Sequence, residues 1–371
     1  PPPPPPPFSS RRRHTRSRLL SRGLGDVYKR QGKRLPKLAI ADLPTPISTH
    51  RLSSGSRSFE VAVKHDEATS SLYGGNKIRK LEYLLRRASD RGAQRIATFG
   101  AVGSNHALAT AIHANRLGFD CTCFLSHQKA TPNIPRTLNM HRKLGTELVR
   151  WGRSTDHLAM YRQYLQHRKT WEIPLGGTCW LGAVGFVNAG LELAEQIRRA
   201  EIPCPARIYI ACGTTGSAAG LALGLAAARL PTTVHAIQVA DNPFSSERKL
   251  RKLMAKTHLI LNRLDPSLKA TGWQQRVVWR DEFLAGGYAK ANDVTAAAVA
   301  AAREYLDLSL ETTYTGKAMA AMLHDLQSPG YSGEPYMFWN TYNSKKLPVT
   351  SDRPDAWDVI PEEFARYYAS V

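Results

Sequence analysis

The sequence predicts an α/β fold built on parallel strands. From about residue 38, short apolar segments with strand character alternate with helical patterns. With 371 residues, of which 42% are hydrophobic and 22% charged, the chain has an ordinary composition and the length for one large domain or two. No apolar run approaches the ~20 residues of a transmembrane helix, so we expect no membrane partner.

The predicted elements follow one another in a nearly regular alternation. The short apolar segments predicted as strands are 95–100, 120–125, 146–151, 171–175, 207–212, 233–240 and 336–340. The segments with helical patterns are 107–118, 134–144, 155–169, 183–200, 217–229, 293–306 and the residues that follow "YTGK". This order predicts parallel strands joined by helical crossovers, and no repeat of fixed period interrupts it.

The first 37 residues differ from the rest of the chain. They hold eleven Lys or Arg and one acid, Asp26, so they carry +10 of the formal charge of +21 and leave +11 for the other 334 residues. Seven prolines precede a basic cluster, without the apolar centre of a secretory signal. A basic arm for RNA, a disordered extension and translated sequencing-adaptor read-through are three interpretations, and we favour the last. The remaining basicity is too diffuse to indicate a nucleic-acid partner.

The five cysteines are odd in number and lie mostly in apolar, strand-like surroundings: Cys121, Cys123, Cys179, Cys204 and Cys212. Cys121 and Cys123 form a C-x-C spacing without a second pair or a nearby pair of histidines. This pattern favours reduced thiols in a cytoplasmic protein over a disulfide framework or a zinc site. We therefore expect no metal.

A loop of small residues after the strand at 207–212 is the clearest predicted anion site. In "ACGTTGSAAGLALGL" it consists of Gly213, Thr214, Thr215, Gly216 and Ser217. Glycines allow backbone N–H groups to converge, the hydroxyls add donors, and the following helix adds partial positive charge at its N-terminus. The pattern is neither G-x-G-x-x-G nor a Walker motif, so it suits one terminal phosphate. A tight strand-to-helix turn without a ligand is the alternative interpretation.

Three further segments have the composition of ligand-binding loops. "GAVGSNHALAT" (100–110) offers Ser104, Asn105 and His106 at a helix start, where backbone N–H groups and side-chain donors suit a carboxylate. His106 and His113 share a helix face, but no carboxylate completes a ligand set, and ordinary histidines are the simpler interpretation. "IPLGGTCWLGAVGF" (173–186) brings glycines to a helix entry. "ETTYTGKAM" (311–319) presents Tyr314 and Thr315 at the start of another predicted helix. A helix cap followed by an ordinary core tyrosine is the alternative interpretation of this segment.

Lys77 lies in "SLYGGNKIRKLEYLL", directly after Gly74, Gly75 and Asn76. An isolated lysine is usually solvated, but these glycines permit an unusual backbone shape before a helical segment. The same chain carries the separate single-phosphate loop at 213–217. A Schiff-base lysine and a cradle for one phosphate are the two requirements of pyridoxal phosphate, which the sequence therefore predicts as the cofactor.

These segments, in this order, resemble the motifs of the D-cysteine desulfhydrase and aminocyclopropane-carboxylate deaminase family. They are "GGNKIRKLEYLL", "GAVGSNHALATA", "IPLGGTCWLGAVGFVNAGLELAEQI", "CGTTGSAAGL" and "YTGKAM". The resemblance implies the tryptophan-synthase-β-like fold (fold type II), with two open, twisted, mostly parallel sheets and flanking helices. It also implies a homodimer and the following division: a basic extension at 1–37, a large cofactor-binding domain at 38–81 and 191–345, a small domain at 82–190, and a tail at 346–371.

The resemblance also implies roles for individual residues. Lys77 would form the Schiff base next to Asn76, and Asn105 would contact the phenolic oxygen of the cofactor. Ser104 and His106, with Asn105, would lie by the carboxylate of an amino-acid substrate, and Tyr314 would lie against cofactor and substrate. Lys77, Ser104 and Tyr314 are the implied catalytic residues. The other implied cofactor contacts are Gly213, Thr214, Thr215, Gly216, Ser217, Thr315 and Thr341.

Thr315 and Thr341 indicate a branch of this family. The deaminase branch resembles "YEGK" with a later leucine, and the desulfhydrase branch has a hydroxyl residue after the tyrosine and a threonine in "HTGG". This chain has "YTGK" and "NTYNS", which favour a desulfhydrase. A carboxylate at the pyridine nitrogen gives the strong electron sink that ring opening needs, whereas a neutral hydroxyl suffices when a good leaving group departs from Cβ. Asn340, Tyr342 and Asn343 replace the histidine and two glycines of that motif, so the exact substrate stays open.

We therefore expect α,β-elimination from a small β-substituted amino acid, with D-cysteine as the first candidate and pyruvate, ammonia and hydrogen sulfide as products. Lys77 would serve both as covalent anchor and as base. The alternatives are deamination of aminocyclopropane carboxylate, elimination from D-serine, chloroalanine or cysteate, a non-catalytic cofactor carrier, and a nucleic-acid-binding protein driven by basic charge.

Overall fold

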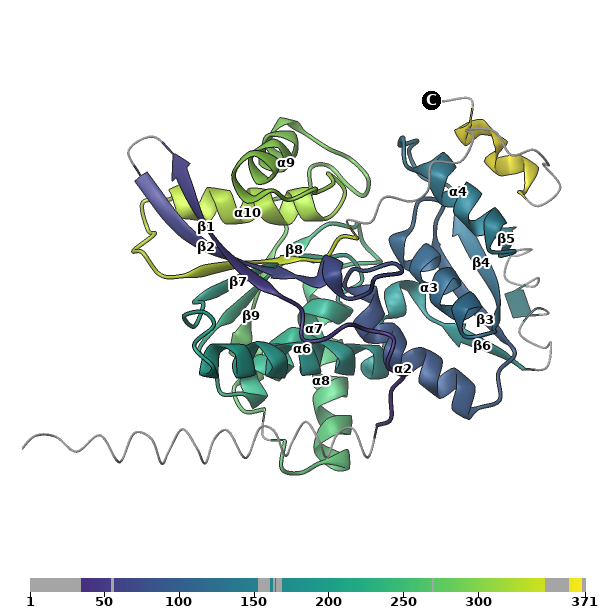
Figure 1. The fold of residues 1–371 in the computed structure, drawn as a ribbon, viewed down its shortest axis with the longest axis horizontal. Helices are drawn as coiled ribbons and strands as arrows, with labels where there is room; N and C mark the ends of the chain where they lie inside the picture. Colours follow the sequence, from purple (N-terminus) through teal and green to yellow (C-terminus); the bar gives the residue numbers. More distant parts are fainter. Residues whose placement is uncertain are drawn as a thin grey trace, which may run out of the picture.

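The chain folds around two β-sheets with helices packed against them (Figure 1). The computed structural model describes residues 35–54, 57–152, 161–162, 164, 169–268, 270–343 and 360–368. Most strand pairs are parallel, as the sequence predicts. Within these described segments, no helix combines the length and the apolar character that crossing a membrane requires.

The larger sheet has six strands in the order β1-β2-β10-β7-β8-β9. They are β1 (Ile47–Ser54), β2 (Arg57–His65), β7 (Arg207–Cys212), β8 (Thr233–Gln238), β9 (Val277–Arg280) and β10 (Tyr336–Asn340). β1 is antiparallel to β2, and the other neighbouring pairs are parallel. Because β10 pairs with β2, in the register Asn340 to His65, the residues after β10 lie beside the segment that leads to Lys77.

The smaller sheet has four parallel strands in the order β5-β4-β3-β6. They are β3 (Arg95–Ala101), β4 (Asp120–Ser126), β5 (Glu147–Arg150) and β6 (Thr170–Ile173). α3 (Asn105–Arg116) and α4 (Ile134–Lys143) supply crossovers between parallel neighbours. The short η5 (Glu362–Tyr367) from the predicted tail packs here, with Phe364 buried and the Tyr367 hydroxyl donating to the carbonyl of Gln128 at 2.9 Å.

Helices cover both faces of the larger sheet, which is why its inner strands β7, β8 and β10 are apolar on both sides. α9 (Asp293–Leu306) and α10 (Thr315–Gln327) lie on one face, and α6 (Trp180–Arg198), α7 (Gly216–Ala227) and α8 (Glu247–Leu264) lie on the other (Figure 1). Along β10, Phe338 packs with α9 and α10, whereas Met337 and Trp339 pack with the other group. This alternation follows from the two-residue period of a strand.

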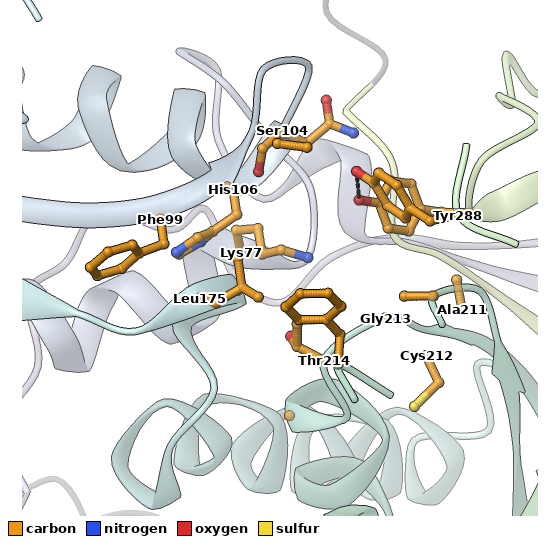
Figure 2. Close-up of a pocket in the computed structure, with 18 of the residues that line it drawn as sticks. Lys77, Phe99, Ser104, His106, Leu175, Ala211, Cys212, Gly213, Thr214 and Tyr288 are labelled. Carbon is orange, nitrogen blue, oxygen red and sulfur yellow. Dashed lines mark hydrogen bonds between the residues drawn. The ribbon is translucent and has the colours of Figure 1, made fainter. Parts of the chain in front are cut away.

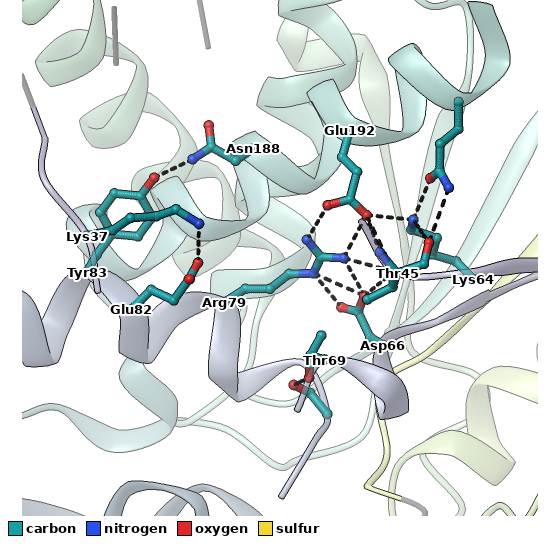
Figure 3. A network of polar contacts seen from close by, with 12 residues as sticks. Lys37, Thr45, Lys64, Asp66, Thr69, Arg79, Glu82, Tyr83, Asn188 and Glu192 are labelled. Carbon is teal, nitrogen blue, oxygen red and sulfur yellow. Dashed lines mark hydrogen bonds and ion pairs between the residues drawn. The ribbon is translucent and has the colours of Figure 1, made fainter. Parts of the chain in front are cut away.

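A buried ion-pair network holds α2 (Lys77–Asp90) against β2 and α6 (Figure 3). Arg79 donates to Asp66 Oδ1 at 2.8 Å and to Glu192 Oε2 at 2.9 Å, and Lys64 Nζ lies 2.6 Å from Glu192 Oε1. Lys64 and Asp66 are fully buried and Arg79 is nearly so. Burial alone would raise the pKa of Glu192, but the charges of Arg79 and Lys64 outweigh it and lower that pKa to about 2. The network therefore fixes the helix that begins at Lys77.

The predicted elements agree closely with the structure where a single period dominates the sequence. The strands at 207–212 and 336–340 and the helix at 293–306 have the predicted bounds. The helix expected at 183–200 begins earlier, at Trp180, because Cys179 caps it. Most of the helix expected at 155–169 lies outside the described residues. β1, β2, α8 and β9 lie outside the predicted elements.

The two sheets fall on either side of the expected domain division, but α2 and α6 run across its boundaries at 81–82 and 190–191. The expected extension 1–37 also includes folded residues at its end. Leu35 is buried in the core around the smaller sheet, and Lys37 Nζ lies 2.7 Å from a carboxylate oxygen of Glu82.

Candidate active site

A cavity of about 550 Å³ lies between the carboxyl ends of the two sheets (Figure 2). This volume is usual for a small-molecule site, and the carboxyl ends of parallel strands are where such sites form in α/β folds. Its walls come from the ends of β3, β4 and β7, from the starts of α2 and α3, and from the residues after β10. Lys77 extends into this space, between the segment of Ser104 and His106 and the loop of Gly213 and Thr214 (Figure 2).

The backbone before Lys77 requires its two glycines. A Cβ on Gly74 would lie 1.9 Å from the carbonyl oxygen of Glu67, and Gly75 has a φ of +97°, which side chains disfavour. Lys77 is the first residue of α2, and its Nζ donates to Asn76 Oδ1 at 2.9 Å. Burial lowers the pKa of Lys77 to about 8, so a larger fraction of its amine is neutral and nucleophilic at physiological pH.

Asn76 joins this lysine to the predicted phosphate loop. Its Nδ2 donates to Ser217 Oγ at 2.9 Å, across 141 residues of sequence. Ser217 belongs to the first turn of α7, and Thr215, the residue before this helix, has a left-handed φ of 71°. The loop and the helix N-terminus therefore line the same cavity as Lys77, where their backbone N–H groups can serve an anion.

Lys80, one turn after Lys77, adds a second cation beside the same loop. Its Nζ donates to the carbonyl of Gly176 at 3.1 Å and lies 2.9 Å from where a Cβ on Gly216 would be. Burial, followed by the charge of Lys77, lowers its pKa well below the ordinary lysine value. No carboxylate among the described residues forms an ion pair with Lys80. A buried amine without a protein counter-ion suits a phosphate group, which would supply the missing negative charge.

The smaller sheet contributes the three predicted carboxylate-site residues. Ser104 is the N-cap of α3 and accepts from the N–H of Ala107 at 3.3 Å. Asn105 lines the cavity and is half-buried, whereas His106 is buried. The Nε2 of His106 lies 3.1 Å from Thr98 Oγ1. Burial, with the charges of Lys77 and Lys80, holds the pKa of His106 well below its ordinary value, so the ring is neutral. These groups therefore provide donors and a helix N-terminus, as an anionic ligand requires.

Tyr314 lies in the cavity wall beside a second tyrosine, Tyr288, that no sequence motif marks. The hydroxyls of Tyr314 and Tyr288 are 2.6 Å apart, and both residues line the cavity. Burial raises the pKa of Tyr314 well above 10 and that of Tyr288 to about 12, so both hydroxyls keep their protons at neutral pH. The pair can therefore donate one hydrogen bond into the cavity.

Thr315 and Thr341 occupy different surroundings. Thr341 lines the cavity, and its carbonyl accepts from the N–H of Asn76 at 3.2 Å. Thr315 is buried, is not among the lining residues, and donates its hydroxyl to Glu311 Oε1 at 3.1 Å. Glu311 does line the cavity, but its carboxylate accepts three backbone N–H groups at the start of α10, from residues 313, 314 and 315. Contact of Thr315 with the cofactor therefore stays a prediction.

The structure places the three residues that depart from the family motif, Asn340, Tyr342 and Asn343, in different surroundings. Tyr342 lines the cavity. Asn340 is buried at the end of β10 and accepts from the N–H of Tyr342 at 3.2 Å, whereas Asn343 Oδ1 accepts from the N–H of Gly74 at 3.0 Å. Asn343 thus supports the backbone before the lysine, Asn340 supports the segment after β10, and Tyr342 is part of the cavity wall.

The arrangement fits pyridoxal phosphate. Lys77 offers an amine to an aldehyde, and the 213–217 loop with Lys80 suits a phosphate. Asn105 offers an amide in the same cavity as the Lys77 amine. Lys80, Tyr288 and Glu311 are polar lining residues that the sequence motifs did not assign to the site. Of these, only Lys80 had a local signal, because a residue three positions after Lys77 shares its helix face.

Known proteins give an independent indication of the family. Residues 39–338 match the family described as pyridoxal-phosphate dependent enzyme. D-cysteine desulfhydrases from Klebsiella pneumoniae and from Salmonella choleraesuis are each 31% identical over 324 residues, which cover 85% of this chain and 96% of the relative.

Solved structures agree with these relatives. An ACC deaminase homologue has a TM-score of 0.71 and 28% identity, and the match covers 86% of this chain and 94% of that one. A fungal L-serine ammonia-lyase from Rhizomucor miehei has a TM-score of 0.54 at 18% identity, covering 80% and 92%, and shares the fold. The fold is therefore the tryptophan-synthase-β-like fold and the cofactor is pyridoxal phosphate. The lysine, the single-phosphate loop and these relatives together show that the chain belongs to the pyridoxal-phosphate dependent enzyme family.

Proposed function

We propose that this enzyme catalyses α,β-elimination from a small β-substituted amino acid, with D-cysteine as the leading substrate. Water and D-cysteine would give pyruvate, ammonia and hydrogen sulfide. The observation that carries the proposal is the Asn76 bridge, which joins the Lys77 amine to Ser217 of the phosphate loop. The names of the curated relatives and the place of Thr341 in the cavity wall support the choice of a desulfhydrase.

The residues of the cavity divide the chemical work. Bound pyridoxal phosphate supplies an aldehyde for the substrate amine and an electron sink for the charge that develops at Cα. The Lys77 amine, with its pKa lowered to about 8, is poised to accept the Cα proton. The start of α3, capped by Ser104, holds the substrate carboxylate. The protonated hydroxyl pair of Tyr314 and Tyr288 donates a hydrogen bond to the group that departs from Cβ.

A substrate panel with purified, cofactor-loaded protein tests this proposal. We expect pyruvate from D-cysteine at a higher rate than from L-cysteine or D-serine, and no 2-oxobutyrate from aminocyclopropane carboxylate. Lys77→Ala should abolish turnover and the visible absorbance of the bound cofactor, whereas Lys256→Ala, an exposed lysine on α8, should retain both. Wild-type turnover in Lys77→Ala would contradict the assigned base.

Deamination of aminocyclopropane carboxylate is the second candidate. The solved ACC deaminase homologue favours it, as does the carboxylate of Glu311 in the cavity wall. The Glu311 carboxylate already accepts N–H groups at the start of α10 and is therefore occupied within the protein. For this reason we rank the deamination second. Production of 2-oxobutyrate in the same panel would reverse the ranking, and cofactor absorbance without any product would indicate a carrier.

We further propose a cytoplasmic homodimer. All five cysteines are free thiols, as a reducing compartment favours, and the dimer rests on the family resemblance. Sedimentation analysis of the purified protein would test the subunit number.

A further inference from the structure

A chain of hydrogen bonds leads from the backbone before Lys77 to Asn105. Gly74 N–H donates to Asn343 Oδ1 at 3.0 Å, so the NH₂ group of this amide is left for its other neighbour. That neighbour is Tyr73, whose hydroxyl is hydrogen-bonded by the Asn343 side chain. The Tyr73 hydroxyl then donates to Asn105 Oδ1 at 3.3 Å. Each link therefore sets the direction of the next one.

The direction matters at Asn105, because this residue lines the cavity and the two ends of an amide have opposite polarity. With Oδ1 occupied by Tyr73, the NH₂ group is the end that is free to face a ligand. An NH₂ group stabilises an anionic oxygen, whereas an amide carbonyl would repel it. The tyrosine thus decides whether the side chain attracts or repels the cofactor's phenolic oxygen.

We propose that Tyr73 and Asn343 are positioning residues that orient the Asn105 amide so that its NH₂ group faces the phenolic oxygen of the cofactor. Neither residue lines the cavity, so both act through Asn105. The inference rests on the cofactor of the family and does not depend on which substrate is used. It also gives a role to Asn343, which stands where the resembling motif has a glycine.

Tyr73 is well anchored for this role. The residue is 4% exposed, and its carbonyl oxygen lies 3.1 Å from Nε2 of His113 on α3. Burial is the main factor that raises its pKa, so the hydroxyl keeps the proton that it donates. Its two contacts with α3, at His113 and Asn105, prevent the tyrosine from shifting relative to the helix that it serves. Asn343 follows β10, so the chain of hydrogen bonds connects both sheets.

A purely structural role is the competing explanation, and a matched pair of variants separates the two. Tyr83 is also buried and its hydroxyl also bonds an asparagine, Asn188, but Asn188, unlike Asn105, does not line the cavity. Tyr73→Phe should weaken cofactor binding about two- to tenfold, the value of one neutral hydrogen bond. It should also change the pH dependence of the bound cofactor's visible absorption. Tyr83→Phe should lower the melting temperature about as much as Tyr73→Phe does. It should leave cofactor affinity and the pH dependence of the absorption unchanged.

Asn343→Asp tests the direction of the chain. The carboxylate can still accept from Gly74 N–H, but it has no NH₂ group and attracts the Tyr73 proton to itself. Asn105 then loses the donor that holds its carbonyl, so this variant should impair cofactor binding at least as much as Tyr73→Phe. In an Asn105→Ala background, Tyr73→Phe should have no further effect on cofactor affinity.

These measurements need no substrate, so a protein that lacks D-cysteine activity but shows the expected cofactor effects would contradict only the proposed function. Wild-type cofactor affinity and absorption in both Tyr73→Phe and Asn343→Asp would overturn the inference. Equal cofactor effects in Tyr73→Phe and Tyr83→Phe would also overturn it, because the role would then be structural.

Discussion

Lys77 and Lys80 lie one helical turn apart at the start of α2 and line the same cavity. Two ammonium groups so close together, in a site that shields them from water, raise each other's cost of ionisation. A bound anion offsets this unfavourable free energy, because it supplies the missing counter-charge. The pair therefore predicts opposite effects on the apoprotein and on the cofactor complex.

Lys80→Gln tests this expectation. Glutamine keeps a donor for the carbonyl of Gly176 but removes the buried charge, so the apoprotein should melt at a higher temperature than the wild type. Cofactor affinity should fall about 10- to 100-fold, since a hydrogen bond to a charged group is lost. Thermal melts of the apoprotein and cofactor titrations measure the two effects. Lys256→Gln on the surface of α8 is the control, and a loss of stability in apo Lys80→Gln would contradict the explanation.

The lowered pKa of Lys77 predicts a pH dependence of cofactor loading. Only the neutral amine reacts with an aldehyde, and its fraction rises as pH increases through the pKa of about 8. The loading rate of apoprotein should therefore rise to a plateau above about pH 8, rather than rising to about pH 10 as for an ordinary lysine. Stopped-flow absorbance at a series of pH values measures it. A rate that still increases tenfold per pH unit above pH 9 would show an unperturbed amine.

Sequence reasoning identifies site residues where a motif has its own chemistry. Lys77, the 213–217 loop and Ser104 to His106 are of this kind, and the structure brings them to one cavity. Tyr288 lies in an irregular segment between β9 and α9, where no period or motif marks it. In the sequence, Tyr73 looks like an ordinary core aromatic residue before two glycines. Its role depends on partners 32 residues away and beyond, which a local pattern does not contain.

The helix α2 is held by charge rather than by an ordinary cap. Asn76 precedes it without capping an N–H group, because its side chain is used by Lys77 and Ser217. Its first turn contains no acid, so the helix dipole is not compensated locally. The ion pairs of Arg79 with Asp66 and Glu192 take the place of the missing N-cap and of acidic residues in the first turn. They fix the helix on its buried side. Stability of this element should therefore depend strongly on Arg79.

Arg79→Met should lower the free energy of unfolding by about 3–5 kcal/mol, because Asp66 would remain buried without its ion-pair partner. Arg86→Met on the same helix is the matched control. The Arg86 side chain is 40% exposed and, among the described residues, pairs only with Asp90, so its loss should change stability by less than about 0.5 kcal/mol. Urea denaturation of both variants provides the comparison. Equal effects would show that the buried network is energetically unimportant.

Among the elements, α9 and β7 were predicted with their observed bounds, whereas β1, β2 and α8 were not predicted. α9 is alanine-rich with an Asn292 cap, and β7 is a continuous apolar run, so their bounds follow from sequence. β1 and β2 contain many polar residues, since their pairing at one edge of the sheet leaves part of them exposed. α8 buries Leu250, Met254 and Leu261 at helical spacing, so its apolar stripe could be recognised in the sequence although the helix was not predicted.

For the whole molecule, the α/β class and the two-sheet architecture were predictable, but the position of β10 was not. A strand from the end of the chain lies between β2 and β7, and only tertiary pairing determines this order. The expected domain boundaries cut through α2 and α6, because motif spacing locates loops and does not show which helices span both sheets.

The order of synthesis gives the Asn76–Ser217 contact and its neighbours a further meaning. Asn76 meets a residue 141 positions later, and Gly74 meets Asn343 across 269 positions. Closing such long loops is entropically costly and follows the formation of local structure. A growing chain therefore has no complete cofactor site until β10 has left the ribosome. Capture of the cofactor would then report that the chain has been made and folded through β10.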